Sequence, residues 1–397
     1  MKKNNLFGFF LFLFSLSFAQ SLQQPTFLHL ANGEKVALSD AQALAKEGFS
    51  YQMEKLEKGY IFTISTLTGK ISGDIQVEIP FIFNVEESQI VANGFQSWTD
   101  TKGQNVRAKI KTISPLAAPI MKPYGDYGFT KYQKGKIGGW GWGYVSKGNE
   151  NTLFASLNDS NAYTEIIFQP KNNQVFVRKE LEGVKEVPQN GEVMRILVNQ
   201  SNTLQNNFSL YFEKGSFPIS TETAKTGWTS WYYHYTNINE KIITDNLAHF
   251  AEKAVPITYF QIDDGWQQAV GYWLIVNKKF PQGLKKITAE THAKGYQSGL
   301  WLAPFVCEKE SDLYKKHPDW ILKDAKGRKV KAGYSPLWSG YFYALDFYHP
   351  EVRAYLKQVF HTVLNDWDFD MVKLDFLYGV AILPQKGKSR GQVMWEA

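Results

Sequence analysis

The 397-residue sequence contains a single cysteine, Cys307, so no disulfide bond can form within the chain. Histidine is also scarce, with seven residues. Four of them lack ligand spacing with acidic partners: His292, His317, His349 and His361. We therefore expect surface histidines, no metal, no other cofactor, and a protein held together by packing.

An excess of charge of one sign is also missing. Lys and Arg total 44 against 38 Asp and Glu, giving a net charge of +6, and no run of basic residues could track a phosphate backbone. This balance excludes nucleic acid as a partner. A hydrophobic content of 44% with 21% charged residues excludes intrinsic disorder as the main state, and the length favours more than one domain.

Aromatic residues, by contrast, are abundant: 12 Trp, 21 Tyr and 28 Phe make up 15% of the chain. Trp and Tyr combine a flat apolar face with a polar group, which suits them to stacking against sugar rings or bases. Since nucleic acid is excluded, the composition points to carbohydrate.

The N-terminus has the pattern of an export signal. Lys2 and Lys3 precede an apolar run, Leu6–Phe18, which ends at the small residue Ala19. This run is shorter than the ~20 residues that a membrane-spanning helix needs. We expect cleavage after Ala19 rather than a retained anchor, and an exported protein, periplasmic or extracellular, with no membrane association after cleavage.

Residues 25–220 are predicted to form an antiparallel β-sandwich. Short alternating segments, such as residues 60–64, 75–79 and 174–178, are separated by Gly, Asn and Lys turns. One short helix is expected over residues 39–47, where Ser39-Asp40 can cap an Ala-rich turn. Many short strands without alternating helices are typical of a sandwich.

The pattern changes near Thr221, after which strand-like runs alternate with amphipathic helices. Four such units form half of a (β/α)8 barrel, and residues 221–397 are fewer than the ~250 of a complete one. We therefore expect an incomplete barrel and a truncated chain. The expected strands are 226–232, 257–262, 297–306 and 371–376; the expected helices are 239–253, 284–294, 350–365 and one that begins at 391.

Polar residues follow these strands at the edge where active sites of parallel α/β folds gather. Asp263 and Asp264 come directly after the second strand, and each buried carboxylate must find a donor or a cation. An Asp-Gly turn is the simpler interpretation of the same residues. In the fourth strand, the period of two places Lys373 and Asp375 on one face, either as a structural ion pair or as a nucleophile held ionised by Lys373.

The first strand ends in the aromatic run Gly227-Trp228-Thr229-Ser230-Trp231-Tyr232. Trp228 and Trp231 either pack on opposite faces of this strand or place one ring as a wall against a sugar.

Four motifs, in this order, resemble those of the retaining α-galactosidases of glycoside hydrolase family 36, and more distantly family 27. The resemblance covers the chain after the export signal, and the four motifs are 227–232, Asp263-Asp264-Gly265-Trp266, 299–305 and Lys373-Leu374-Asp375. It implies a sandwich before a barrel, with Asp375 as the nucleophile and Lys373 as a substrate ligand.

The resemblance also implies the binding residues. Asp263 and Asp264 would bind the 4- and 6-hydroxyls of galactose, and Trp231 and Trp301 would shape its pocket. In some relatives the sandwich contributes a tryptophan to the rim of the pocket, and Trp98 is the candidate here. The alternative is that Trp98 lies in the core of the sandwich. Leu374 departs from the motif, because many relatives have Trp there.

Hydrolysis with retention of the anomeric configuration requires a second carboxyl group, which acts as acid/base. In the family it lies on a later strand, beyond Ala397, and Glu308, Glu310 and Asp346 do not match its role. We therefore expect the N-terminal part of an exported hydrolase that removes terminal α-galactosyl residues from oligosaccharides, with little or no activity by itself. The alternatives are a carbohydrate-binding protein without catalysis and a galactosyltransferase of the raffinose-synthase type. The sequence leaves the oligomeric state open.

Overall fold

A computed structural model describes residues 22–96, 99–107, 114, 116, 119, 135–218, 220 and 222–397. The expected export signal, 1–19, and the candidate residue Trp98 lie outside these residues. Among the helices within the described ranges, none has the length and apolar character needed to cross a bilayer.

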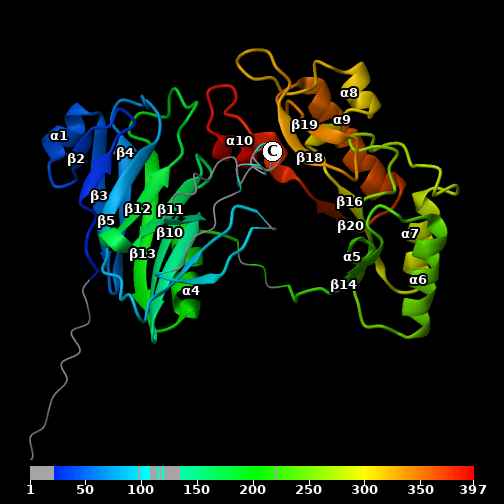
Figure 1. Cartoon of the computed structure of the whole chain (residues 1–397), viewed down its shortest axis with the longest axis horizontal. Coiled ribbons are helices and arrows are strands. Elements are labelled where there is room, and N and C mark those ends of the chain that lie inside the picture. Colours follow the sequence, from blue (N-terminus) through cyan, green and yellow to red (C-terminus); the bar gives the residue numbers. More distant parts are fainter. Residues whose placement is uncertain are drawn as a thin grey trace, which may run out of the picture.

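The N-terminal part consists of two antiparallel sheets (Figure 1). The six-stranded sheet has the order β2-β1-β5-β12-β11-β8, and the seven-stranded sheet has the order β3-β4-β13-β10-β9-β6-β7. The first contains β1 (Phe27–His29), β2 (Lys35–Ala37), β5 (Ile75–Pro80), β8 (Ile137–Trp140), β11 (Thr164–Gln169) and β12 (Gln174–Lys179). The second contains β3 (Phe49–Leu56), β4 (Gly59–Thr66), β6 (Gln89–Ala92), β7 (Gly103–Asn105), β9 (Trp142–Lys147), β10 (Glu150–Ser156) and β13 (Glu192–Ser201).

One apolar core lies between these two sheets. Val77 and Val175 from the six-stranded sheet share it with Phe62 and Ile196 from the seven-stranded sheet, and all four are almost completely buried. Alternation along each strand places such residues on the inner face, which is why the two sheets pack face to face. The strands expected over 60–64, 75–79 and 174–178 are confirmed as parts of β4, β5 and β12.

Within the described ranges, two α-helices accompany these sheets. The expected one is confirmed as α1 (Ala41–Lys46), where the Asp40 side chain accepts the backbone N–H of Ala43. The second, α4 (Leu204–Gly215), was not predicted; it covers the outer face of the seven-stranded sheet through Phe208 and Tyr211. A short 3₁₀ turn, η1 (Pro170–Asn172), links β11 to β12.

The C-terminal part contains a four-stranded parallel sheet in the order β14-β15-β16-β20. Its strands are β14 (Gly227–Thr229), β15 (Tyr259–Ile262), β16 (Gln297–Leu302) and β20 (Met371–Leu374). The predicted strands are therefore confirmed but shorter. The first ends at Thr229 because the aromatic run continues as the helical turn α5 (Trp231–His234), and the third ends before Ala303.

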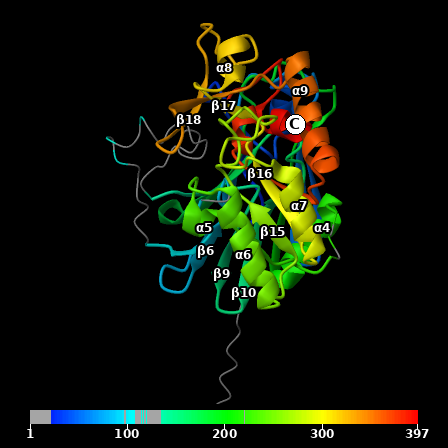
Figure 2. The ribbon, with the colours of Figure 1, turned by 90° about the vertical axis from the view of Figure 1, so that its right-hand side faces the viewer.

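Helices cover the side of the parallel sheet that faces away from the antiparallel sheets (Figures 1 and 2). Their apolar stripes pack on Phe260, Leu300 and Leu302 in one buried cluster. The three predicted helices are confirmed as α6 (Glu240–Glu252), α7 (Leu284–Ala293) and α9 (Pro350–His361), which continues into the π-helical turn η2 (Thr362–Asp366).

The connection between β16 and α9 was predicted only as a long loop. It holds α8 (Asp312–Lys316) and a three-stranded antiparallel sheet of order β17-β19-β18. These strands are β17 (Val306–Glu308), β18 (Lys331–Ser335) and β19 (Gly340–Ala344).

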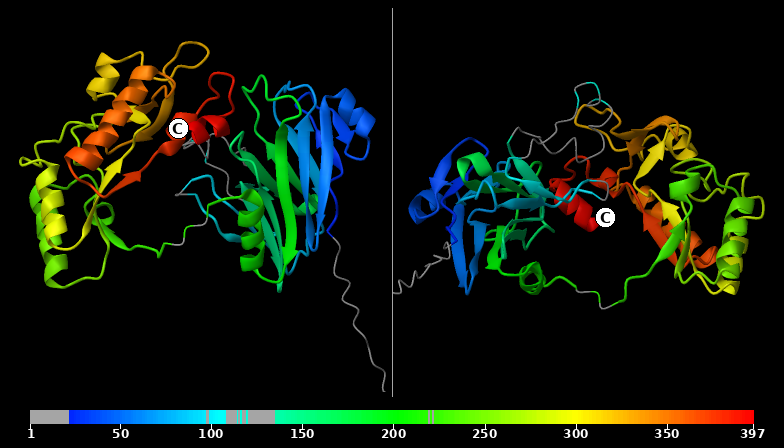
Figure 3. Two further views of the ribbon diagram at one scale, coloured as in Figure 1. Left: turned by 180° about the vertical axis from the view of Figure 1, so that it is seen from behind. Right: turned by 60° about the horizontal axis from the view of Figure 1, so that its bottom comes forward.

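The last segments join the two parts of the molecule. After β20 come the 3₁₀ turn η3 (Leu377–Ala381) and the helix α10 (Arg390–Glu396), which begins where a further helix was expected and lies beside the antiparallel sheets (Figure 3). Arg390 forms a buried, two-pronged ion pair with Glu180, and the Ser389 hydroxyl donates to the carbonyl of Asn161 at 2.7 Å.

Candidate active site

The candidate site lies at the carboxyl edge of the parallel sheet. Alternation along β15, β16 and β20 turns a set of side chains to the side opposite α6 and α7, as their mutual contacts show. These side chains are Gln261, Asp263, Trp301, Lys373 and Asp375. The predicted placement of Lys373 and Asp375 on one face agrees with these contacts. Gly299 lies in β16 between β15 and β20, where a Cβ would lie 2.7 Å from Met371 Cε and 3.0 Å from Gln261 Cγ, so its lack of a side chain leaves room for both neighbours.

Asp263 is the most strongly held carboxylate, with a side chain that is only 2% exposed. Its Oδ2 accepts from Lys373 Nζ at 2.8 Å, Gln261 Nε2 at 3.0 Å and the Thr229 hydroxyl at 3.3 Å. The cation and the neutral donors together offset the cost of burying this charge. Lys373 was expected to act on Asp375 by proximity, but its recorded ion pair is with Asp263.

Asp264 occupies a second position and is as deeply buried, with 3% exposure. Gln267 Nε2 donates to its Oδ1 at 2.6 Å, and the indole N–H of Trp338 donates to its Oδ2 at 2.8 Å. Burial raises the pKa of Asp264, aided by the nearby charges of Asp263 and Glu308, while the two hydrogen bonds oppose that rise. Neither of these two donors is a cation.

Asp375 directly follows β20 and is only partly buried. The indole N–H of Trp301 donates to its Oδ2 at 3.2 Å, and the backbone N–H of Phe376 donates to its Oδ1 at 2.8 Å. Phe376 has φ +54°, so the chain turns sharply there and does not continue the predicted strand to residue 376. Two donors thus orient a carboxylate that solvent or a ligand can reach.

Continuous contacts join the four expected polar residues. The backbone N–H of Asp264 donates to Asp263 Oδ1 at 2.9 Å, which places the two carboxylates side by side. From Asp264 the contacts run through Trp338 to Trp301, whose ring centroids are 6.3 Å apart, and then to Asp375. Asp263, Asp264, Lys373 and Asp375 therefore gather at one edge, together with Trp301.

The two tryptophans expected in the first strand, Trp228 and Trp231, lie in different surroundings. Trp228 stacks on Phe260 at a centroid distance of 4.2 Å, on the helix-covered side. Trp231 lies in α5 after the strand has ended, and its recorded ring contact is with Tyr235, at 5.3 Å. Its expected place in a galactose pocket therefore stays a prediction, as does that of Trp98.

Sequence reasoning missed two residues of this site. Gln267 follows the Asp263-Asp264-Gly265-Trp266 motif by one residue, so its position was the available signal. Trp338 lies in the turn between β18 and β19, and no periodic pattern connects it to the carboxylates.

Glu308 was not proposed as the acid/base, and its contacts are structural. Its carboxylate accepts the backbone N–H of Val270 at 2.7 Å and that of Ser339 at 2.6 Å, so it fixes the turn that carries Trp338. A buried carboxylate occupied by two backbone donors acts as a local scaffold.

Two of the histidines have acidic neighbours that their sequence spacing did not reveal. His292 Nε2 lies 2.7 Å from Asp370 Oδ2, which accepts from Ser298 as well. His349 forms a group with Asp319 and Glu351 whose ligand atoms lie within 4.8 Å of one another. These histidines were expected to lack ligand spacing with acidic partners, yet helix and loop packing brings Asp370 beside His292 and Asp319 beside His349.

Comparison with known proteins shows what part of the chain is similar to. Residues 218–392 match the melibiase family model. The α-galactosidase of Escherichia coli is 32% identical over 155 residues, and the α-galactosidase AgaA of Geobacillus stearothermophilus is 29% identical over 153 residues. Each match covers 37% of this chain and 20% of the relative, so the matched region is about a fifth of the length of these curated proteins.

Solved structures show the same fold over a longer stretch. The α-galactosidase of Thermus thermophilus in complex with stachyose superposes with a TM-score of 0.66 and 24% identity, covering 87% of this chain and 70% of that one. A family 36 α-galactosidase from Geobacillus stearothermophilus gives a TM-score of 0.52 at 15% identity, covering 88% and 54%. Over part of their length, the chain thus resembles the α-galactosidases of glycoside hydrolase family 36.

Proposed function

We propose that this chain contributes the galactose-binding edge and the nucleophile of a retaining glycoside hydrolase that removes terminal α-galactosyl residues from oligosaccharides. The observation that carries the proposal is the convergence of Asp263, Asp264, Lys373 and Asp375 beside Trp301. The relatives named above are α-galactosidases, and the structure of one of them contains stachyose.

The proposed chemistry follows from the state of each carboxylate. Asp375 is oriented by two donors yet partly exposed, which suits attack of one oxygen on the anomeric carbon. The bond from that carbon to the leaving oxygen breaks as the glycosyl–aspartate ester forms, and water then hydrolyses the ester with net retention. A separate acid/base would donate the proton to the leaving oxygen. By resemblance to the family, we place this residue on a later strand of the barrel.

The other groups would bind the sugar. Asp263 and Asp264 accept hydrogen bonds and would take the galactose 4- and 6-hydroxyls, while Lys373 can donate to the sugar as well as to Asp263. Trp301 and Trp338 present indole rings next to these groups. A compact set of charged acceptors against an aromatic surface is a common design for neutral sugars.

We also propose that the two parts are domains, with a sandwich over 25–220 and part of a (β/α)8 barrel over 221–397. Parallel pairing in chain order with helices on one face supports the barrel. The N-terminal pattern supports export, and recovery of exported protein that starts at Gln20 would test that part.

The nucleophile is tested with an aryl α-galactoside whose leaving group departs without protonation. We expect a galactosyl adduct on the peptide that contains Asp375, detected by mass spectrometry after rapid acid quenching. Asp375→Asn should give no adduct, whereas Asp366→Asn, a matched change at an exposed carboxylate, should label like the wild type.

Other results would point to the alternatives. Labelling of a different carboxylate would disprove the role of Asp375. Galactose binding without any adduct would favour a non-catalytic binding protein, and adduct transfer to a sugar in preference to water would favour a galactosyltransferase. Hydrolysis of melibiose by this 397-residue chain at an ordinary enzyme rate would contradict our expectation of low activity.

A further inference from the structure

A cavity of about 700 Å³ lies between the end of β20 and the antiparallel sheets. Asp375 and Phe376 contribute to one side of it, and Trp140, Trp142 and Asp159 contribute to the other. This volume is within the ~300–1,000 Å³ typical of small-molecule sites and leaves room beyond a single sugar ring. Residues of both parts therefore border one space that includes the proposed nucleophile.

The far wall is aromatic. Trp140 contacts Tyr163 and Phe95 at ring-centroid distances of 5.9 Å and 5.0 Å, and Tyr163 lies 5.3 Å from Phe95. Trp142, two residues further, is half-buried and borders the same cavity. Such rings offer flat apolar faces to the C–H face of a sugar.

Gly141 lies between the two tryptophans and permits this wall to approach a carboxylate. Its φ is +72°, and a Cβ at this position would lie 3.1 Å from Asp159 Oδ2. A residue with a side chain would therefore be strained there and would crowd the acid. The backbone conformation keeps Asp159 next to the aromatic wall.

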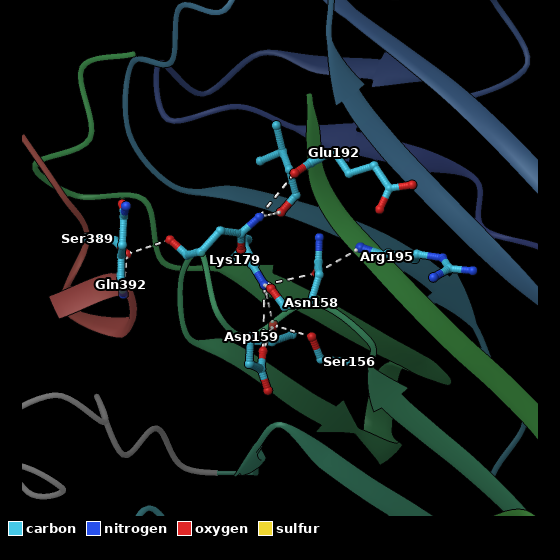
Figure 4. A network of polar contacts seen from close by, with 11 residues as sticks. Ser156, Asn158, Asp159, Lys179, Glu192, Arg195, Ser389 and Gln392 are labelled. Carbon is cyan, nitrogen blue, oxygen red and sulfur yellow. Dashed lines mark hydrogen bonds and ion pairs between the residues drawn. The ribbon is translucent and has the colours of Figure 1, made fainter. Parts of the chain in front are cut away.

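Asp159 has one occupied and one unoccupied oxygen. Its Oδ1 accepts from the Thr164 hydroxyl at 2.5 Å and lies 3.6 Å from Lys179 Nζ (Figure 4). No hydrogen bond to Oδ2 is recorded within the described ranges, and the side chain is 37% exposed. An acceptor at the cavity border is therefore available to a ligand hydroxyl.

Lys179 determines which kind of ligand fits. It is completely buried and also donates to the Asn158 carbonyl at 2.7 Å and to Thr164 at 3.0 Å. Because this cation already balances the charge of Asp159, the pair does not require a cationic ligand. A neutral ligand rich in hydroxyl groups is the better match.

Tyr163 supplies the second polar group. Its ring belongs to the aromatic wall, and its hydroxyl oxygen is buried without a hydrogen-bond partner in the described part of the chain. An unpaired buried hydroxyl costs free energy that a ligand can recover by pairing with it. This feature points to a ligand independently of Asp159.

We propose that this wall binds the sugar to which the terminal galactose is attached, with Asp159 and Tyr163 as the residues that bind its hydroxyls. The proposal rests on the function proposed above, because Asp375 on the opposite side would hold the galactosyl residue. It makes the antiparallel part a determinant of which oligosaccharides are accepted.

The test compares the affinities of the 397-residue chain for galactose, raffinose and stachyose by calorimetry. We expect the wild type to bind the oligosaccharides more tightly than galactose. Tyr163→Phe should weaken stachyose binding about 5- to 20-fold, as expected for a lost hydrogen bond, and leave galactose unchanged. Asp159→Asn should act in the same direction.

Tyr163→Phe removes only a hydroxyl that has no hydrogen-bond partner among the described residues, so we expect it to fold like the wild type. Tyr51→Phe, in strand β3 and outside the cavity lining, is the matched control and should change neither affinity. Equal affinities of the wild type for galactose and stachyose, or equal losses for both sugars in Tyr163→Phe, would overturn this subsite alone. Failure of galactose itself to bind would overturn the proposed function and this subsite together.

Discussion

At the scale of single residues, replacing Trp338 tests what sets the pKa of Asp264. Its indole N–H donates to Asp264 Oδ2, and this bond opposes the rise in the pKa of Asp264 that burial causes. Trp338→Phe keeps an aromatic ring but removes the donor. We expect the pKa of Asp264 to rise further, so galactose binding should be lost at a higher pH than in the wild type as the solution is acidified.

Calorimetric affinities measured between neutral and acidic pH would check this. Trp320→Phe is the matched control, because Trp320 also donates its indole N–H to a carboxylate, that of Glu351, which is not among the contacts of the site. Coincident pH profiles for Trp338→Phe and the wild type would show that Asp264 does not govern binding.

Lys179 gives a second prediction at this scale. Burial lowers its pKa to about 8 although Asp159 opposes the change, whereas the unfolded chain should have an ordinary lysine pKa of ~10.4. Between these values the unfolded state binds more protons than the native state, so the free energy of unfolding should rise with pH. From pH 7 to 10 this increase is on the order of 2 kcal/mol.

Urea unfolding of the wild type and of Lys179→Met at several pH values would measure this contribution. The difference in the free energy of unfolding between the wild type and Lys179→Met should change by about 2 kcal/mol from pH 7 to 10, because the other titrating groups are common to both proteins. A difference that stays constant with pH would mean that Lys179 titrates normally in the folded protein.

Sequence reasoning succeeded where a residue's direction follows from its own strand. The period of two correctly turned Lys373 and Asp375 to the same side. It did not predict the partner of Lys373, because the choice of Asp263 depends on β15, two strands away across the sheet. Trp338 was not predictable for the same reason, since its position depends on packing between distant segments.

At the scale of elements, periodicity predicted the helices α6, α7 and α9 nearly to their ends. Asn237 or Asn239 was the expected cap of α6, and Asn239 caps it. Pro350 marked the start of α9, because Pro suits a first turn. α4 was missed although Thr203 caps it, since its surroundings were interpreted as part of a continuous run of strands. The β17-β19-β18 sheet was missed because its strands are short, with three to five residues each, and pair with one another rather than with the parallel sheet.

At the scale of the whole molecule, the buried pair of Arg390 and Glu180 connects the segment after β20 to the antiparallel sheets. Both side chains are less than a tenth exposed, and a Cβ on the adjacent Gly391 would lie 2.4 Å from the backbone nitrogen of Tyr163. Contacts this close should make the two parts unfold as one unit. Removing one partner of a buried pair leaves the other charge uncompensated, at a cost of about 3–5 kcal/mol.

We therefore expect a single calorimetric unfolding transition for the wild type and two separate transitions for Glu180→Gln, the first at a lower temperature. Replacing both residues by apolar ones, Glu180→Leu with Arg390→Met, should recover much of the lost stability, because no charge is then left buried. Asp245→Asn breaks an exposed ion pair with Lys241 and should leave the transition within a degree or so of the wild type. If Glu180→Gln still unfolds in one unshifted transition, coupling between the parts does not depend on this pair, and the cavity between them would have to be held in place by other contacts.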